Sequence, residues 1–170
     1  MLYKYKDKTP TLTTNNFIAS GARVIGDTYL GHNVSVWFNA VIRGDANTIY
    51  IDDNSNIQDN VTIHTDTKYK VYIGKNVSIG HNAVIHGCTI NDNCLIGMNS
   101  TILDKAIIGK NCLIGANSLI TSNSVFEDNT LILGSPAKAI KKLTDQQIKE
   151  IHDNSLVYIN FAKDFLNTNM

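Results

Sequence analysis

The sequence has no excess of charge of either sign, and this absence excludes several kinds of partner. Its 170 residues contain 15 Lys and Arg against 15 Asp and Glu, so the formal net charge is zero. Binding to nucleic acid or to a membrane surface depends on a basic surface, so neither is expected. Charged residues make up only 18% of the chain, and part of the surface is therefore expected to be covered by protein partners.

Long apolar runs and paired cysteines are missing as well. The first residues, MLYKYKDKTP, lack the apolar segment of a secretory signal, and no run approaches the length of a membrane span. Cys88, Cys94 and Cys112 form no CxxC pair, and any disulfide would leave one thiol over. These features predict a cytoplasmic protein in which the cysteines are small buried hydrophobes. The length predicts one domain over residues 1–170.

Aliphatic residues recur with a strict period of six. Neither the 3.6-residue period of a helix nor the two-residue period of an ordinary strand explains this spacing. A fixed period of six is typical of parallel β-helices, in which three hexads form one triangular coil. The repeated positions, interrupted by short insertions, are Ile18, Val24, Leu30, Val36, Ile42, Ile51, Ile57, Ile63, Ile73, Ile79, Ile85, Ile90, Ile96, Ile102, Ile108, Ile114, Ile120, Phe126 and Ile132.

Asparagine recurs three positions after the aliphatic residue. It tolerates a positive φ better than other residues with long side chains, so a left-handed backbone turn is expected once per hexad. The position after the asparagine is mostly small, which suits an inward corner. The asparagines in this phase are Asn33, Asn39, Asn54, Asn60, Asn76, Asn82, Asn93, Asn99, Asn111, Asn117, Asn123 and Asn129.

The repeat ends near residue 137, so the β-helix is expected over about 12–137. A helix is predicted over 144–166. Thr144 is a suitable N-cap, and Gln147 completes a capping box with it. Apolar residues follow at helical spacing, which predicts an amphipathic helix that packs against the solenoid.

Three histidines fall in the central coils, and their hexad positions carry the functional hypothesis. His64 and His86 each follow the aliphatic residue on the third face of a coil, with Arg43 in the same position one coil earlier. Imidazoles one strand spacing apart can share one metal at Zn–N distances of about 2.0–2.1 Å. His81 lies on the second face, directly above Asp59. A neighbouring subunit of a threefold ring would bring that face beside the pair, so the residues predict a homotrimer with metal sites between subunits.

Several motifs together resemble the γ-class carbonic anhydrase-like proteins of the left-handed β-helix group. The resemblance implies an all-β solenoid, specifically a left-handed parallel β-helix of hexapeptide repeats with a C-terminal α-helix. It also implies a trimer, with a catalytic metal bound by three histidines across the subunit interface. The motifs are Val41-Ile42-Arg43-Gly44-Asp45, Asn56-Ile57-Gln58-Asp59-Asn60, His64, Gly80-His81-x4-His86-Gly87 and Leu133-Gly134-Ser135-Pro136-Ala137-Lys138.

The resemblance further implies a reaction and roles for individual residues. A zinc-type ion (or Fe²⁺ or Co²⁺) would bind a water whose pKa falls to about 7, and the hydroxide would hydrate carbon dioxide to bicarbonate. Gln58 would orient that hydroxide. Tyr158 on the C-terminal helix matches a position that approaches the metal in short-loop relatives, and packing of the helix explains this tyrosine equally well. Arg43 and Asp59 would form a charge-assisted contact across the interface, and Asp45 would pair with a neighbour's cation. Structural ion pairing at the trimer seam explains Arg43, Asp45 and Asp59 equally well.

One departure from the family and two rival functions stay open. Ala46 follows Asp45, and the loop Thr65–Lys70 has no glutamate, so the glutamates that export the proton in the best-studied relatives are not evident. The same solenoid supports acyltransferases and thioesterases that act on CoA thioesters, because a fold does not fix a function. The other rival is a non-catalytic trimer that keeps its metal for structure.

Overall fold

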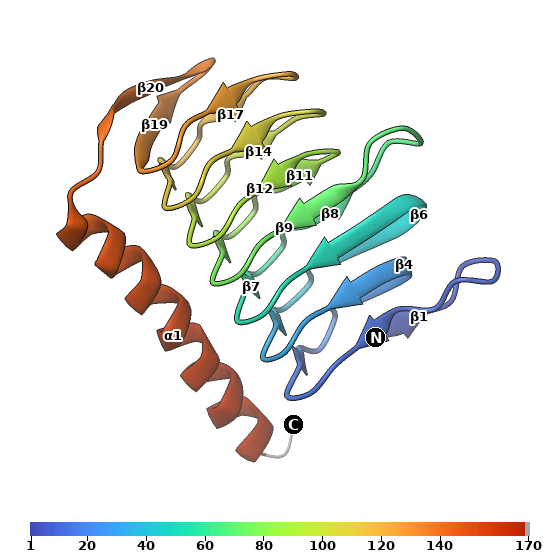
Figure 1. The fold of residues 1–170 in the computed structure, drawn as a ribbon. Helices are drawn as coiled ribbons and strands as arrows, with labels where there is room; N and C mark the ends of the chain where they lie inside the picture. Colours follow the sequence, from blue (N-terminus) through green and yellow to red (C-terminus); the bar gives the residue numbers. More distant parts are fainter. Residues whose placement is uncertain (169–170) are drawn as a thin grey trace.

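The computed structural model describes residues 1–168, so Asn169 and Met170 of the expected domain lie outside the described residues. The chain forms a β-solenoid of about 7 turns followed by one C-terminal helix (Figure 1). The expected fold class, a left-handed parallel β-helix of hexapeptide repeats with a C-terminal α-helix, is confirmed.

Each coil places one short strand on each of three faces, and strands of successive coils pair in parallel. We number the faces in chain order within a coil. The first face consists of β2 (Thr11–Leu12), the second half of β4 (Arg23–Leu30), the second half of β6 (Val41–Ile51), β9 (Val71–Ile73), β12 (Thr89–Ile90), β15 (Ile107–Ile108) and β18 (Val125–Phe126).

The second face ends in a reversal of the chain. Its parallel strands are followed by β20 (Ala137–Lys142), which pairs antiparallel with the last of them. The parallel strands are β3 (Phe17–Ile18), β5 (Ser35–Val36), β7 (Asn56–Ile57), β10 (Ser78–Ile79), β13 (Leu95–Ile96), β16 (Leu113–Ile114) and β19 (Thr130–Gly134).

The third face carries the two histidines that share a column. β4 and β6 are long because each turns the corner from the third face to the first. The strands of the third face are β1 (Leu2–Tyr3), the first halves of β4 and β6, β8 (Thr62–His64), β11 (Val84–His86), β14 (Thr101–Ile102) and β17 (Leu119–Ile120).

The hexad register predicted from the sequence is the register of the sheets. Ile57 pairs with Ile79 on the second face, and Ile63 pairs with Ile85 on the third. All four side chains have 0% exposure and point into one continuous core. Burying an isoleucine completely stabilises a protein by about 1.5–3 kcal/mol. The residues that recur every six positions are therefore the ones whose burial stabilises the solenoid.

The asparagines make the corners of the prism. Every asparagine predicted to turn left-handed has a φ between 55° and 64°. Along one edge their amides form ladders from coil to coil, such as Asn93 Nδ2 to Asn111 Oδ1 at 2.8 Å and Asn111 Nδ2 to Asn129 Oδ1 at 2.8 Å. The corners are therefore fixed both by backbone preference and by side-chain hydrogen bonds.

The cysteines are buried hydrophobes, as expected. Cys88, Cys94 and Cys112 are all unpaired with one another and at most 2% exposed. Burial raises the pKa of the Cys88 thiol to about 12, so this thiol stays protonated and unreactive at neutral pH.

The helix α1 (Asp145–Asn167) runs along the solenoid and packs on the second face (Figure 1). The predicted N-cap Thr144 and its capping box with Gln147 are confirmed. Phe165 contacts Trp37 with ring centroids 5.4 Å apart, and Trp37 contacts Phe17 at 5.0 Å. The apolar stripe of the helix is thus a packing surface. Within residues 1–168, no helix combines the length and the apolar character needed to cross a membrane.

The corner role of asparagine can be tested at Asn123, which is exposed and has a φ of 64°. Replacing Asn123 with Ala should lower the free energy of unfolding by about 1 kcal/mol, because a left-handed residue with a Cβ is strained. Asn123→Gly is the matched control and should cost less, since glycine adopts this conformation freely. Thermal or urea unfolding measures both, and equal losses would contradict the role.

Candidate metal centre

Arg43, His64 and His86 form one column on the third face, as the hexad positions predict. Arg43 on β6 pairs with His64 on β8, and His64 pairs with His86 on β11. Residues paired in this way lie on neighbouring strands with their side chains on the same side of the sheet. The loop Thr65–Lys70 between β8 and β9 leaves the column without disturbing the pairing.

The two imidazoles of the column approach each other closely. His64 Nδ1 lies 3.1 Å from His86 Nε2, and the ring centroids are 5.1 Å apart. The side chains are 23% and 30% exposed, so the nitrogens are partly shielded yet open to a small ligand.

Each of the three candidate ligands contacts a carboxylate through its other ring nitrogen. His64 Nε2 lies 3.0 Å from Asp45 Oδ1, and His81 Nδ1 lies 2.8 Å from Asp59 Oδ2. His86 Nδ1 lies 2.6 Å from an oxygen of Asp104. A carboxylate accepts hydrogen bonds, so these partners assign the ring proton of each neutral histidine to the nitrogen that faces the carboxylate.

This assignment leaves the lone pairs of His64 Nδ1 and His86 Nε2 facing each other. Two acceptors at 3.1 Å repel unless a cation lies between them. Two nitrogens bound tetrahedrally to one zinc ion at 2.0–2.1 Å would be about 3.3 Å apart. Carboxylates behind metal-binding imidazoles are also the usual arrangement in metal sites. The pair therefore fits two ligands of a zinc-type ion.

One chain brings only two of the three candidate ligands together. His81 follows β10 on the second face, whereas His64 and His86 lie on the third. Within the described part of the chain, no three His, Cys, Asp or Glu side chains gather closely enough to hold a metal ion. The side chain of His81 is 38% exposed, and it contacts Asp59 through Nδ1 rather than through Nε2.

Arg43 and Asp45 contact each other within the chain. Arg43 Nη1 donates to Asp45 Oδ2, while Asp45 Oδ1 faces His64. Burial raises the pKa of Asp45, but the hydrogen bonds from Arg43 and His64 and the charge of Arg43 outweigh it, so this pKa lies below its usual value. Gly44 permits the close approach of the neighbouring coil, since a Cβ there would lie 2.6 Å from the carbonyl oxygen of Asp27. Asp45 and Asp59 thus contact their own chain's histidines.

Gln58 has a fixed amide orientation. Its side chain is buried, at 6% exposure, and its Nε2 donates to Asn56 Oδ1 at 3.0 Å. Asn56 in turn donates from Nδ2 to Ser78 Oγ at 2.8 Å. These two hydrogen bonds fix the amide of Gln58 with Oε1 as the remaining acceptor.

Tyr158 lies where α1 crosses the second face. Its ring packs edge-on against Trp37, with centroids 5.6 Å apart. Burial raises the pKa of Tyr158, and the negative charge of Asp59 raises it further. Tyr158 therefore both packs the helix and lies near the carboxylate that contacts His81.

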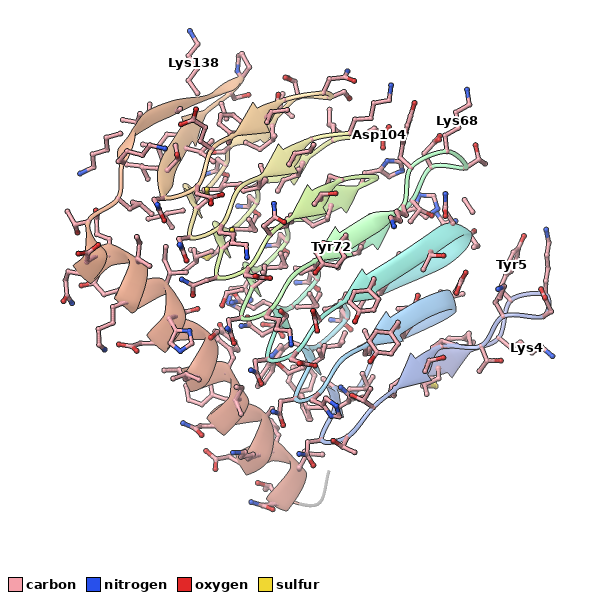
Figure 2. The ribbon with its side chains drawn as sticks, viewed as in Figure 1. Lys4, Tyr5, Lys68, Tyr72, Asp104 and Lys138 are labelled. Atoms are coloured by element: carbon pink, nitrogen blue, oxygen red, sulfur yellow. The ribbon has the colours of Figure 1, made fainter. Side chains whose placement is uncertain are left out.

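Sequence reasoning missed Asp104, the carboxylate behind His86. The repeat gave no direct signal, because Ile85 pairs with Ile102, 17 residues further on, and this register stacks Asp104 over Gly87 rather than over His86. Figure 2 shows Asp104 and Lys68 of the loop Thr65–Lys70 on the side of the solenoid away from α1.

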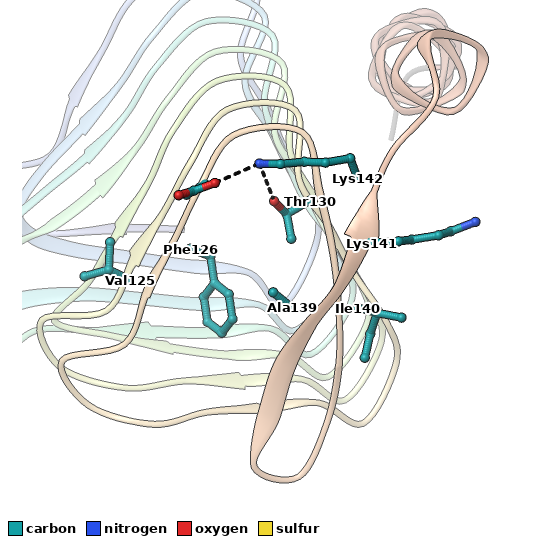
Figure 3. A pocket seen from close by; sticks show the side chains of 8 residues that line it. Val125, Phe126, Thr130, Ala139, Ile140, Lys141 and Lys142 are labelled. Atoms are coloured by element: carbon teal, nitrogen blue, oxygen red, sulfur yellow. Dashed lines mark hydrogen bonds and ion pairs between the residues drawn. The ribbon is translucent and has the colours of Figure 1, made fainter.

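A cavity lies at the C-terminal end of the solenoid. It has a volume of about 300 Å³ and is lined by residues of β18, β19 and β20, including Phe126, Ala139 and Ile140 (Figure 3). Lys142 Nζ at its edge donates to Glu127 Oε2 at 3.0 Å. No histidine lines this cavity, so the histidine column is the better candidate for metal chemistry.

Comparison with known proteins places these features in a family. A family model described as the GMPPB C-terminal domain matches residues 45–154. A "Probable carbonic anhydrase" of Methanocaldococcus jannaschii is 49% identical over 152 residues, which cover 89% of this chain and 96% of that protein. "Gamma carbonic anhydrase 2, mitochondrial" of Arabidopsis thaliana is 40% identical over 92% of this chain and 59% of its own length. The solved structure of a putative acetyltransferase of Bacillus cereus superposes with a TM-score of 0.96, at 37% identity, and covers 99% of this chain and 98% of that one.

The fold and the histidine column define a hexapeptide-repeat solenoid with a candidate metal site on its side. With the similarity of its sequence over most of its length, the chain belongs to the γ-class carbonic anhydrase family of these solenoids.

Tyr158 packs its ring against Trp37 and also lies near Asp59, so substitutions can separate the contribution of the ring from that of the hydroxyl. Tyr158→Ala should lower the free energy of unfolding by about 2 kcal/mol, because a half-buried aromatic contact with Trp37 is lost. Tyr158→Phe keeps the ring and should stay within about 0.5 kcal/mol of the native protein. Thermal unfolding checks both. A large loss with Phe would mean that the hydroxyl itself holds the helix.

Proposed function

We propose that the protein is a γ-type carbonic anhydrase, a lyase that hydrates carbon dioxide reversibly to bicarbonate. The observation that carries the proposal is the pair of imidazole lone pairs, His64 Nδ1 and His86 Nε2, held 3.1 Å apart with a carboxylate behind each ring. Relatives at 40–49% identity bear the name carbonic anhydrase, which supports the same reaction here. The proposed ion is zinc, with iron(II) or cobalt(II) as alternatives.

The proposed assembly is a homotrimer in which His81 of one chain completes the site of the next. A triangular prism cannot bend its second face round to the third, but a threefold ring sets the second face of one chain beside the third face of its neighbour. Two apolar side chains support this contact. Val84 on the third face is 38% exposed, and Met98, one coil beyond His81, is 52% exposed. Covering these side chains with a neighbouring chain would remove apolar surface from water, which is favourable.

The metal ion, when bound, would supply a Lewis acid that activates water for attack on carbon dioxide. The remaining roles belong to the chain. Gln58 Oε1 would accept the proton of the attacking oxygen in a hydrogen bond and so orient its lone pair toward the substrate. The Arg43–Asp45 pair would hold His64 in the tautomer that ligates, and Asp59 would do the same for His81. Tyr158 would line the site near Asp59.

Proton export is the step for which the chain offers least. Ala46 follows Asp45, and in the loop Thr65–Lys70 the carboxylate of Asp66 is engaged by the backbone N–H of Lys68 at 2.7 Å. The proposed enzyme therefore relies on external buffer to remove the proton.

The shared site can be tested by mixing chains. His81→Ala and His64→Ala should each abolish metal binding alone. When the two variants are unfolded, mixed equally and refolded, about a quarter of the interfaces should join an intact His64/His86 pair to an intact His81. Metal binding, measured by elemental analysis after desalting, should return to that extent.

The matched control mixes His64→Ala with His86→Ala. Both lesions then lie on the third face, so no interface holds a complete set and binding should stay absent. Equal recovery in the two mixtures, or none in either, would contradict a site made by two chains.

Catalysis can be tested on protein purified without added metal. Elemental analysis should give about one ion per chain, and the carbon dioxide hydration rate should climb with buffer concentration at fixed pH and ionic strength. A fast rate that ignores buffer would indicate an internal proton route, with Tyr158→Phe as the first variant to examine. Metal without any hydration activity would favour the structural role instead.

One comparison favours a second candidate, an acyltransferase or thioesterase acting on CoA thioesters. The similar Bacillus cereus structure bears the description putative acetyltransferase, at 37% identity. Such enzymes use a histidine as general base, and a base of that kind does not need a second imidazole facing it. Acetyl-CoA hydrolysis or transfer that survives metal removal would support this candidate against the anhydrase.

A further inference from the structure

Asp104 makes a different contact from the other aspartates in its hexad position. An aspartate two positions after the core residue usually accepts a hydrogen bond from the backbone N–H of the residue in the same hexad position one coil earlier. This hydrogen bond links the two coils. Asp104 instead directs Oδ1 to His86 Nδ1, at 2.6 Å. The usual contacts are Asp53 with His32 N at 2.9 Å, Asp59 with Phe38 N at 3.1 Å, Asp92 with Lys75 N at 3.1 Å and Asp128 with Lys110 N at 2.7 Å.

Gly87 makes room for this contact. It lies one coil below Asp104 and has a φ of +50°. A Cβ at Gly87 would lie 2.2 Å from Asp104 Oδ1, the oxygen that faces His86. Any other residue here would therefore push the carboxylate away from the imidazole.

Residues next to Asp104 and His86 contact Tyr69 of the loop Thr65–Lys70. Lys105 has a φ of 62° at a corner position that asparagine fills in most other hexads. Its Nζ lies 4.7 Å from the centre of the Tyr69 ring, within the range of a cation–π contact. The same tyrosine flanks Gly87, since its Cβ would be 3.2 Å from a Cβ placed there. The contact with Tyr69 accounts for a lysine in the left-handed conformation at this corner, and it places Tyr69 beside Gly87.

We propose that Asp104 is a positioning residue of the metal centre. It fixes His86 with the proton on Nδ1, so that the lone pair of Nε2 points to the position shared with His64 Nδ1. The inference rests on the proposed function, since the shared position is that of the metal ion. Gly87 gives the carboxylate access to the imidazole.

The first readout needs no metal. Histidine labelled with ¹⁵N reports which ring nitrogen carries the proton, and the metal-free protein at mildly alkaline pH should show His86 protonated at Nδ1. Asp104→Ala should move the proton to Nε2 or mix the two tautomers. A merely structural aspartate would leave this signal unchanged. His86→Ala identifies the signal by its loss.

The second readout is the zinc dissociation constant, measured by competition with a chelator. Asp104→Ala should raise it about 10- to 100-fold, the usual effect of removing a carboxylate behind a ligand. Asp104→Asn has the same size, can still accept through its amide oxygen and should give an intermediate value. It also serves if the alanine variant does not fold. Asp128→Ala is the matched control, with the same hexad position but no histidine, and should change neither readout.

The outcomes separate the two proposals. Zinc binding that depends on His64, His81 and His86, yet is as tight in both Asp104 variants as in the native protein, would overturn the role of Asp104 and leave the metal site standing. A native His86 with its proton on Nε2 would overturn it equally. Absence of zinc binding by the native protein would overturn the metal centre and with it this inference.

Discussion

Everything in this molecule depends on the parallel pairing of one coil with the next. Each hexad moves the chain to the next face, and three hexads bring it back to the same face one coil further on. A side chain therefore stacks on the residue in the same hexad position of the previous coil, at the strand spacing of about 4.8 Å. The core is a column of isoleucines for this reason, and the edges are columns of asparagines. The histidine column follows the same rule on the outer surface. The hexad position of a residue in the sequence therefore determines where its side chain lies on the solenoid.

The same rule limits what a column can build. Two stacked imidazoles can bring one ring nitrogen each close enough to share an ion, and those of His64 and His86 lie 3.1 Å apart. A third in the same column would be displaced by about 9.6 Å from the first along the stack, too far for all three to meet comfortably. A third ligand must come from another face. In the proposed trimer a second copy of the chain supplies that face, which is consistent with this limit of stacking.

The sequence predicted the parts that follow from the repeat, and the structure supplies those that do not. The sheet register, the left-handed asparagines, the capping box at Thr144 and the stacking of Arg43, His64 and His86 all follow from hexad counting or local signals. Side-chain rotamers do not. The aspartate two places after the core residue usually ties coils together, so nothing in its spacing marked Asp104 as a partner of His86. Its neighbour Lys105 was the visible irregularity, an exception at an asparagine corner. In the same way, the spacing stacked His81 on Asp59 but did not indicate that Asp45 contacts His64 of its own chain.

A helix that runs back along the stack changes how the chain unfolds. In an unadorned solenoid each coil contacts only its neighbours, so the terminal coils can fray independently of the rest. Here α1 starts beyond the last coil and packs against β3, β5 and β7, which belong to the first coils. Fraying at the N-terminal end must therefore also break contacts with the C-terminal segment. The helix therefore couples the two ends of the solenoid, and unfolding is expected to be cooperative over all the coils. Because the helix contacts the first coils only after the whole solenoid chain has been enclosed between them, closure of that long chain is expected to limit the folding rate.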